Sequence, residues 1–96
     1  MYNQYMIIWD ERKNTKLKLE RNISFEIIAD LILNKKYIDI LDNPARPNQN
    51  IFIFEVEKYI YAVPFIIDNE SNIILKTIYP SRKFYKKYKE IKNGKN

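Results

Sequence analysis

The chain has 96 residues, of which 46% are hydrophobic and 30% charged, and it carries a net charge of +5 without a single cysteine or histidine. This length fits one domain, residues 1–96, with one modest core, and it is too short for a two-domain enzyme. The missing cysteines exclude disulfides, thiolate nucleophiles and zinc–thiolate sites. The missing histidines remove the side chain most used as a general acid or base near neutral pH.

The positive charge is concentrated near the carboxyl end. Residues 76–96 contain eight basic residues and one acid, for a net charge of +7, whereas residues 1–75 carry a net charge of −2. Such a patch attracts phosphate groups by Coulomb forces and by counterion release. A basic tail that only keeps a lysine-rich protein in solution would show the same charge distribution.

The first third of the chain predicts a short strand and two helices. Residues 5–9 (YMIIW) have strand character, and Asp10 suits the N-cap of a charged helix over residues 11–21 that ends at Asn22. Ser24 suits the N-cap of a second helix over residues 25–34. Its apolar residues recur at helical spacing: Phe25, Ile28, Leu31 and Ile32.

The middle of the chain predicts a run of strands. Residues 37–41 form the first, and residues 42–50 follow as a loop with two prolines and three asparagines. The next two strands, 51–57 and 59–67, are joined by a tight link at Lys58. A turn over residues 68–72 leads to the last strand, 73–79.

The end of the chain predicts a basic helix. Pro80 should stop the preceding strand, and Ser81 should cap a helix that runs to about Lys92. On a helical wheel one stripe faces inward, formed by Phe84, Tyr88 and Ile91. The opposite arc faces outward and holds Arg82, Tyr85, Lys86 and Lys89. The last few residues are expected to form a flexible tail.

The order of these elements indicates an α+β domain. It has a mostly antiparallel sheet of four to five strands, two N-terminal helices and a C-terminal basic helix.

Two stretches resemble the BrnT toxins, which belong to the RelE-like superfamily. Residues 9–14 (WDERKN) and 22–26 (NISFE) are similar to the family's opening pattern, W-D-x-x-K-x followed by H-G-[IV]-S-F-E-E. Residues 76–88 (KTIYPSRKFYKKY) are similar to its last strand and terminal basic helix. The chain departs from the family's pattern at two places. Arg21-Asn22 stands where the family has His-Gly, and Pro80-Ser81-Arg82 stands where the family has Ala-Arg.

The resemblance implies a cytoplasmic endoribonuclease that is the toxin of a type II toxin–antitoxin pair and inhibits translation. It also implies a hetero-oligomer with a co-encoded antitoxin, usually one with a ribbon-helix-helix DNA-binding part, and no membrane. Whether cleavage would need the ribosome stays open. The alternative is a non-catalytic module of the same fold that binds nucleic acid or the antitoxin.

RNA carries its own nucleophile, the 2′-OH, so the reaction needs charge stabilisation and positioning more than a histidine. Neither a metal nor another cofactor is expected, because the acidic residues are too sparse for a two-metal site. The candidate catalytic residues are Lys76, Arg82, Lys83 and Tyr85.

Each candidate also has a structural interpretation. A lysine on a partly apolar sheet face, as expected for Lys76, has a lowered pKa suited to proton transfer, but it can equally extend its ammonium to the sheet edge. The fork of Arg82 suits a scissile phosphate or a surface salt bridge. Tyr85 suits base stacking, a weak general acid or helix packing.

The remaining candidates are expected to bind RNA rather than to act in the reaction. They are Lys13, Ser81, Lys86, Lys87 and Lys89. Lys13 is equally explained by a solvated helix face. The rings of Trp9, Phe84 and Tyr88 are expected in the core.

Overall fold

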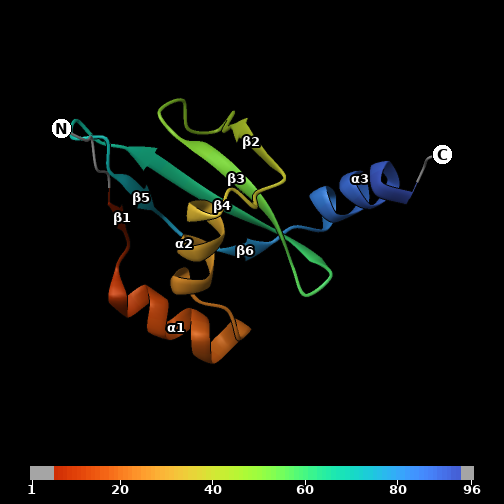
Figure 1. The fold of residues 1–96 in the computed structure, drawn as a ribbon, viewed down its shortest axis with the longest axis horizontal. Helices are drawn as coiled ribbons and strands as arrows, with labels where there is room; N and C mark the ends of the chain where they lie inside the picture. The colour runs from red at the N-terminus through yellow and green to blue at the C-terminus, as the bar shows by residue number, and fades with distance from the viewer. Residues whose placement is uncertain (1–5, 94–96) are drawn as a thin grey trace.

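The computed structural model describes residues 6–93, with side chains up to residue 89. The elements follow one another as β1 (Ile7–Ile8), α1 (Glu11–Arg21), α2 (Phe25–Leu33), β2 (Asp39–Asp42), β3 (Asn50–Val56), β4 (Tyr59–Ile67), β5 (Ile73–Leu75), β6 (Tyr79–Pro80) and α3 (Arg82–Asn93) (Figure 1). The start of the expected first strand at Tyr5, the Ile91 side chain and the expected tail lie outside the described residues.

The strands of residues 6–93 form one sheet in the order β1-β5-β4-β3-β2, and β6 pairs with β4 next to β5. All pairs are antiparallel except that of β1 with β5, which is parallel. The α+β class and the mostly antiparallel sheet are thus confirmed. The expected four to five strands were too few, because residues 73–79 form two short strands instead of one.

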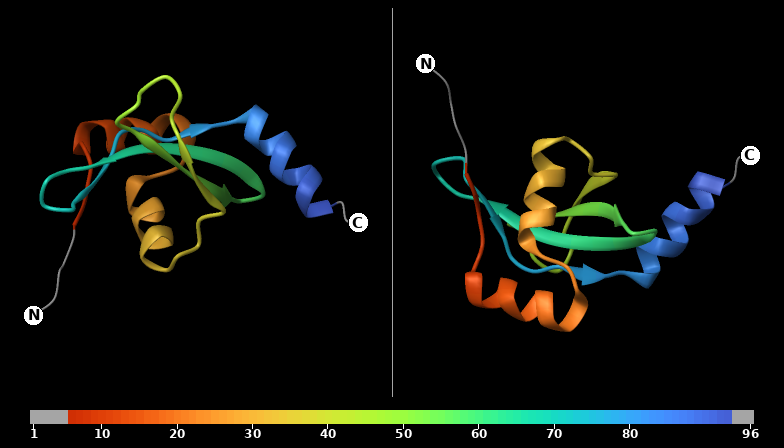
Figure 2. Two further views of the ribbon diagram at one scale, coloured as in Figure 1. Left: turned by 90° about the horizontal axis from the view of Figure 1, so that it is seen from above. Right: turned by 60° about the horizontal axis from the view of Figure 1, so that its bottom comes forward.

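The two faces of the sheet are covered by different helices. The larger core lies under α1 and α2, where Leu17, Phe25 and Ile28 pack on Phe52 and Phe54. The smaller core lies on the other face, where Phe84 and Tyr88 of α3 pack on the strand residues Ile51, Ile53, Ile60 and Ala62. Both views in Figure 2 show α3 projecting beyond the end of the sheet, away from α1 and α2.

The helix ends are set by the residues that the sequence indicated. The Asp10 carboxylate accepts from the backbone N–H of Arg12 at 2.9 Å, and Asn22 ends α1 in the left-handed conformation with φ 55°. The Ser24 hydroxyl accepts from the N–H of Ile27 at 3.2 Å. These contacts satisfy backbone groups that a helix leaves unpaired at its ends.

The hairpin of β3 and β4 turns over two residues rather than over Lys58 alone. Glu57 and Lys58 both have positive φ, 51° and 69°. Two successive positive φ values are the geometry that matches the right-handed twist of the flanking strands.

The expected strand 73–79 is interrupted by a bulge. Between the pairs Phe65–Leu75 and Ala62–Tyr79, β4 contributes two residues and the partner strand contributes three, 76–78. An extra residue in one strand shifts the alternation of side chains. Leu75 and Ile78 therefore both enter the larger core, although strict alternation along one strand would place them on opposite faces of the sheet. The chain leaves the sheet at Pro80 as expected, but Pro80 is itself the last residue of β6.

Candidate functional site

The sequence-predicted site residues lie in three parts of the fold. Lys13 is in α1, Lys76 is in the bulge between β5 and β6, and the other residues begin at Ser81 and continue along α3. Lys76 is exposed and does not stand on a sheet face, so the expected placement of this lysine was wrong.

The start of α3 is held by Ser81, which is only 9% exposed. Its hydroxyl accepts from the N–H of Phe84 at 3.1 Å, and its own N–H donates to the carbonyl of Ile60 at 3.0 Å. Ser81 is thus a cap that ties the helix to β4. The next two residues, Arg82 and Lys83, are exposed in the first turn of the helix.

The charge of this first turn is unusual for a helix. The helix dipole favours acidic side chains at the N-terminus and disfavours cations there. The first turn of α3 nevertheless holds Arg82 and Lys83 and no acid. Among the described side chains Arg82 forms no ion pair, so the salt bridge considered for it is not seen there. A bound anion would offset both the cations and the dipole.

Tyr85 lies against the sheet and not on the outward arc of α3. Its ring stacks on that of Tyr59 at 4.6 Å between centroids and 19° between planes, and it packs on the smaller core. Of the interpretations offered by the sequence, the structure places Tyr85 in the packing role. The outward position that was expected for it was wrong.

The lysines of α3 up to Lys89 lie on the exposed surface of the helix. Three of them lie over aromatic rings: Lys83 over Phe84, Lys87 over Tyr88, and Lys89 over Tyr85. The distances from Nζ to the ring centroids are 5.7, 5.4 and 5.3 Å, within the range of a cation–π contact. Lys86 is exposed as well. The helix thus presents a row of exposed cations, three of which lie over aromatic rings of the same helix.

Tyr88 ties the same helix to the edge strand β2. Its hydroxyl donates to the Asp39 carboxylate at 2.9 Å. Burial, with the hydrogen bond and the negative charge of Asp39, raises the pKa of Tyr88 to about 12. The sequence indicated the core position of Tyr88 but not this partner, because residues 49 positions apart give no local signal.

Lys13 contacts the bulge rather than open solvent alone. Its Nζ donates to the carbonyl of Lys76 at 2.8 Å. At the end of the same helix, Arg21 Nη1 donates to the carbonyl of Ile78 at 2.6 Å. The structure therefore brings Lys13 and Lys76 together, and it adds Arg21, which the sequence analysis did not select as a site residue.

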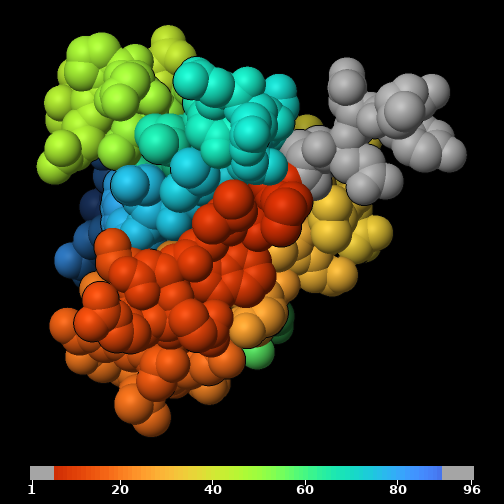
Figure 3. All heavy atoms as spheres, turned by 90° about the vertical axis from the view of Figure 1, so that its left-hand side faces the viewer, coloured from red at the N-terminus to blue at the C-terminus, as the bar shows by residue number. Residues whose placement is uncertain are grey.

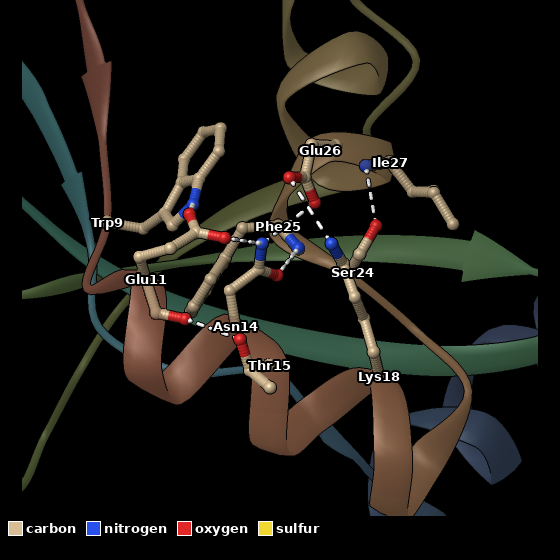
Figure 4. A network of polar contacts seen from close by, with 9 residues as sticks. All are labelled: Trp9, Glu11, Asn14, Thr15, Lys18, Ser24, Phe25, Glu26 and Ile27. Atoms are coloured by element: carbon tan, nitrogen blue, oxygen red, sulfur yellow. Dashed lines mark hydrogen bonds and ion pairs between the residues drawn. The ribbon is translucent and has the colours of Figure 1, made fainter.

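The motif residues of the first two helices form a polar network (Figure 4). Asn14 is fully buried; its amide donates to Glu26 at 2.8 Å, and its carbonyl oxygen accepts from the N–H of Phe25 at 2.8 Å. Glu11 accepts from the indole N–H of Trp9 at 2.9 Å. The network joins α1 to α2, so this part of the motif has a structural role.

Glu26 remains ionised in this network to a lower pH than a free side chain. The hydrogen bond from Asn14 is the main reason that the pKa of Glu26 lies below its ordinary value of 4.5, although partial burial acts in the opposite direction. Lys18, at 3.5 Å, adds a smaller electrostatic contribution.

Two cavities in the described part of the chain are lined by other residues. The larger, of about 420 Å³, is an apolar hollow between the end of α2 and the sheet, beside Leu33, Tyr37 and Phe52. The smaller lies between α1 and α2 beside Lys18 and Asn22.

Within residues 6–93 no three acidic side chains are grouped as a metal site would need. No helix there is long and apolar enough to cross a membrane.

Comparisons with known proteins point to one fold. No model of a protein family matches the chain, and no curated protein is significantly similar in sequence. Among solved structures, the ribonuclease toxin BrnT of Brucella abortus, determined at 1.1 Å resolution, superposes with a TM-score of 0.60. The match covers 81% of this chain and 97% of the toxin at 22% sequence identity. The chain therefore has the fold of the BrnT toxin.

Proposed function

We propose that this protein is the toxin of a type II toxin–antitoxin pair and acts as an endoribonuclease that inhibits translation. The observation that carries the proposal is the match to BrnT, because it spans 97% of that ribonuclease toxin. The exposed cations at the start of α3 support it, since a phosphate there would offset their unfavourable position.

In the proposed reaction the 2′-oxygen of RNA attacks the adjacent phosphorus, and the bond from phosphorus to the 5′-oxygen breaks. The proton of the 2′-OH passes to water, and the leaving 5′-oxygen takes up a proton. The products are a 2′,3′-cyclic phosphate, which water can open to a 3′-phosphate, and a 5′-OH. No step of this scheme requires a metal.

The side chains have separate roles in this proposal. Arg82 and Lys83 stabilise the charge that develops on the phosphoryl oxygens. Lys76 donates the proton to the leaving 5′-oxygen. Lys86, Lys87 and Lys89 hold phosphates on either side of the cleaved bond, and Ser81 keeps the start of α3 in place. Tyr85 supports the helix through its stack on Tyr59 and takes no direct part in the reaction.

The proposed partners are an RNA substrate and a cognate antitoxin of the ribbon-helix-helix type, in a cytoplasmic hetero-oligomer. The exposed cations of α3 offer a natural place for acidic antitoxin side chains, because such a partner would neutralise the surface that RNA needs.

A non-catalytic RNA-binding protein is the second candidate. It is favoured by Tyr88, whose hydroxyl donates to Asp39 and whose pKa is raised to about 12, which removes this phenol from acid–base work in a chain without histidine. Such a protein would use the same cations for binding but would leave the RNA intact.

Expression of the chain alone in a bacterium tests the proposal. We expect growth arrest with loss of messenger RNA, and we expect Arg82→Ala to restore growth at an equal level of soluble, folded protein. Lys36→Ala, which removes a charge from the segment between α2 and β2, serves as the control and should remain toxic. Normal growth with intact messenger RNA in cells that accumulate the wild-type chain would contradict it.

A further inference from the structure

The bulge between β5 and β6 begins at Lys76, which lies opposite Pro64 of β4 in the sheet. The N–H of Lys76 donates to the carbonyl of Pro64 at 2.8 Å. In an antiparallel sheet such a pair normally exchanges two hydrogen bonds, the second from the facing N–H. Pro64 has no N–H. The carbonyl of Lys76 is therefore left without its donor from β4.

Lys13 of α1 supplies this missing donor. Its Nζ lies 2.8 Å from the carbonyl oxygen of Lys76. The contact is exposed, and it gives the carbonyl a charged donor from another element where β4 offers none, which stabilises the interruption of the strand.

A second carbonyl of the same segment also faces α1. The N–H of Ser81 donates to Ile60 in β4, and backbone groups of alternate residues point to opposite sides of a strand. The carbonyl of Ile78 thus points away from β4, to a side where no strand follows β6 in the described part of the sheet. Arg21 Nη1 donates to it at 2.6 Å.

The two contacts join one helix to one short segment. Lys13 and Arg21 lie two turns apart on α1 and reach carbonyls two residues apart in the bulge. Figure 3 shows α1, in orange-red, packed against the light-blue chain of β5 and the residues after it. Ile78 is fully buried in the larger core, so the segment is fixed from both sides.

We propose that Lys13 and Arg21 are positioning residues that hold residues 76–82 in the path required by the ribonuclease site. Lys76 lies at the first contact, and Arg82 follows four residues after the second. This inference rests on the proposed function for its catalytic part.

The first test is amide hydrogen exchange on the full chain. Lys13→Ala and Arg21→Ala should increase the exchange of the amides of Lys76 and Ser81, both of which donate to β4. Lys16→Ala removes the same charge from an exposed position of the same helix and should leave this exchange unchanged. Unchanged exchange in both contact variants would overturn the proposal, whether or not the wild-type chain cleaves RNA.

The second test separates positioning from binding. Arg21→Ala should lower kcat for RNA cleavage about tenfold to a hundredfold, while KM changes no more than in Lys16→Ala. Arg21→Lys, which keeps a donor, should recover part of the rate. A rate in Arg21→Ala equal to that of Lys16→Ala would overturn the catalytic part.

A wild-type chain that cleaves no RNA would refute the proposed function instead. The exchange experiment would then still decide whether Lys13 and Arg21 hold the segment, so the two failures are distinguishable.

Discussion

At the scale of single residues, Asn14 shows why a polar side chain can belong to a core. It is fully buried between two helices, and its amide has partners on both sides: Glu26 accepts from it, and the N–H of Phe25 donates to it. Buried polar groups are tolerated when they are hydrogen-bonded, and their removal leaves the partners unsatisfied. The sequence indicated the motif around Asn14, but helical periodicity alone would assign a polar residue to solvent.

Asn14→Ala should therefore destabilise the protein strongly. We expect the free energy of unfolding in urea to fall by about 3 kcal/mol, because a hydrogen bond to a carboxylate and one to a backbone N–H are lost together. Lys16→Ala in the same helix should change it by less than about 0.5 kcal/mol. A loss below about 1 kcal/mol for Asn14→Ala would show that the network contributes little to stability.

At the scale of elements, α3 is attached to the sheet by aromatic side chains. Tyr85 stacks on Tyr59 in β4, Phe84 packs on the smaller core, and Tyr88 donates to Asp39 in β2. The inward position of Phe84 and Tyr88 followed from helical spacing. The inward position of Tyr85 did not follow from it, because a helical wheel places a residue by its angle alone. The wheel does not include the β3–β4 hairpin, whose Tyr59 contacts α3 from the side.

The attachment of α3 should weaken at high pH through Tyr88. The folded protein keeps the phenol proton up to about pH 12, whereas the unfolded chain releases it near pH 10. A group whose pKa is higher in the folded protein than in the unfolded chain stabilises the fold at any pH below its unfolded-chain pKa. This stabilisation is lost as the pH rises to its pKa in the folded protein. Wild-type stability should therefore fall between about pH 10 and 12.

Tyr88→Phe should remove this part of the pH dependence. Its melting temperature should fall less than that of the wild type over the same range, since the variant has no phenol at this position to lose a proton. Thermal denaturation followed by circular dichroism at several pH values provides the measurement. Parallel curves for the two proteins would refute the assigned role of Tyr88.

The split of residues 73–79 marks the limit of local sequence reasoning. A run of apolar residues with one lysine predicts a continuous strand, and the proline that interrupts it lies in β4, on the opposite side of the ladder. The donors that stabilise the interruption come from α1, more than 50 residues away along the chain. Neither the proline opposite the strand nor the donors from α1 can be found without knowing which distant segments lie side by side.

At the scale of the whole molecule, caps and periodicity predicted the order of the elements well. Asp10, Asn22, Ser24 and Ser81 act at helix ends as expected, since these contacts are local. The concentration of charge near the carboxyl end was also evident from the sequence. Its arrangement as an exposed row on a projecting helix became clear only in three dimensions.

This row should determine how RNA affinity depends on salt. Replacing Lys86, Lys87 and Lys89 together with alanine should weaken binding to single-stranded RNA. The slope of log K against log salt concentration should decrease in magnitude by about 2, as expected when three phosphate contacts are lost. Titrations at several salt concentrations provide the slope, with Lys35→Ala, Lys36→Ala and Lys58→Ala combined as a control of equal charge. Equal slopes for the two triple variants would exclude α3 as the RNA-binding surface.

The decisive measurement of ribonuclease activity is cleavage of RNA by the purified chain in excess EDTA, with analysis of the new ends. We expect fragments with 2′,3′-cyclic phosphate or 3′-phosphate and 5′-OH ends, and no fragments with Arg82→Ala at equal stability. Cleavage that needs added Mg²⁺, fragments with 5′-phosphate ends, or full activity in folded Arg82→Ala would contradict the proposed reaction.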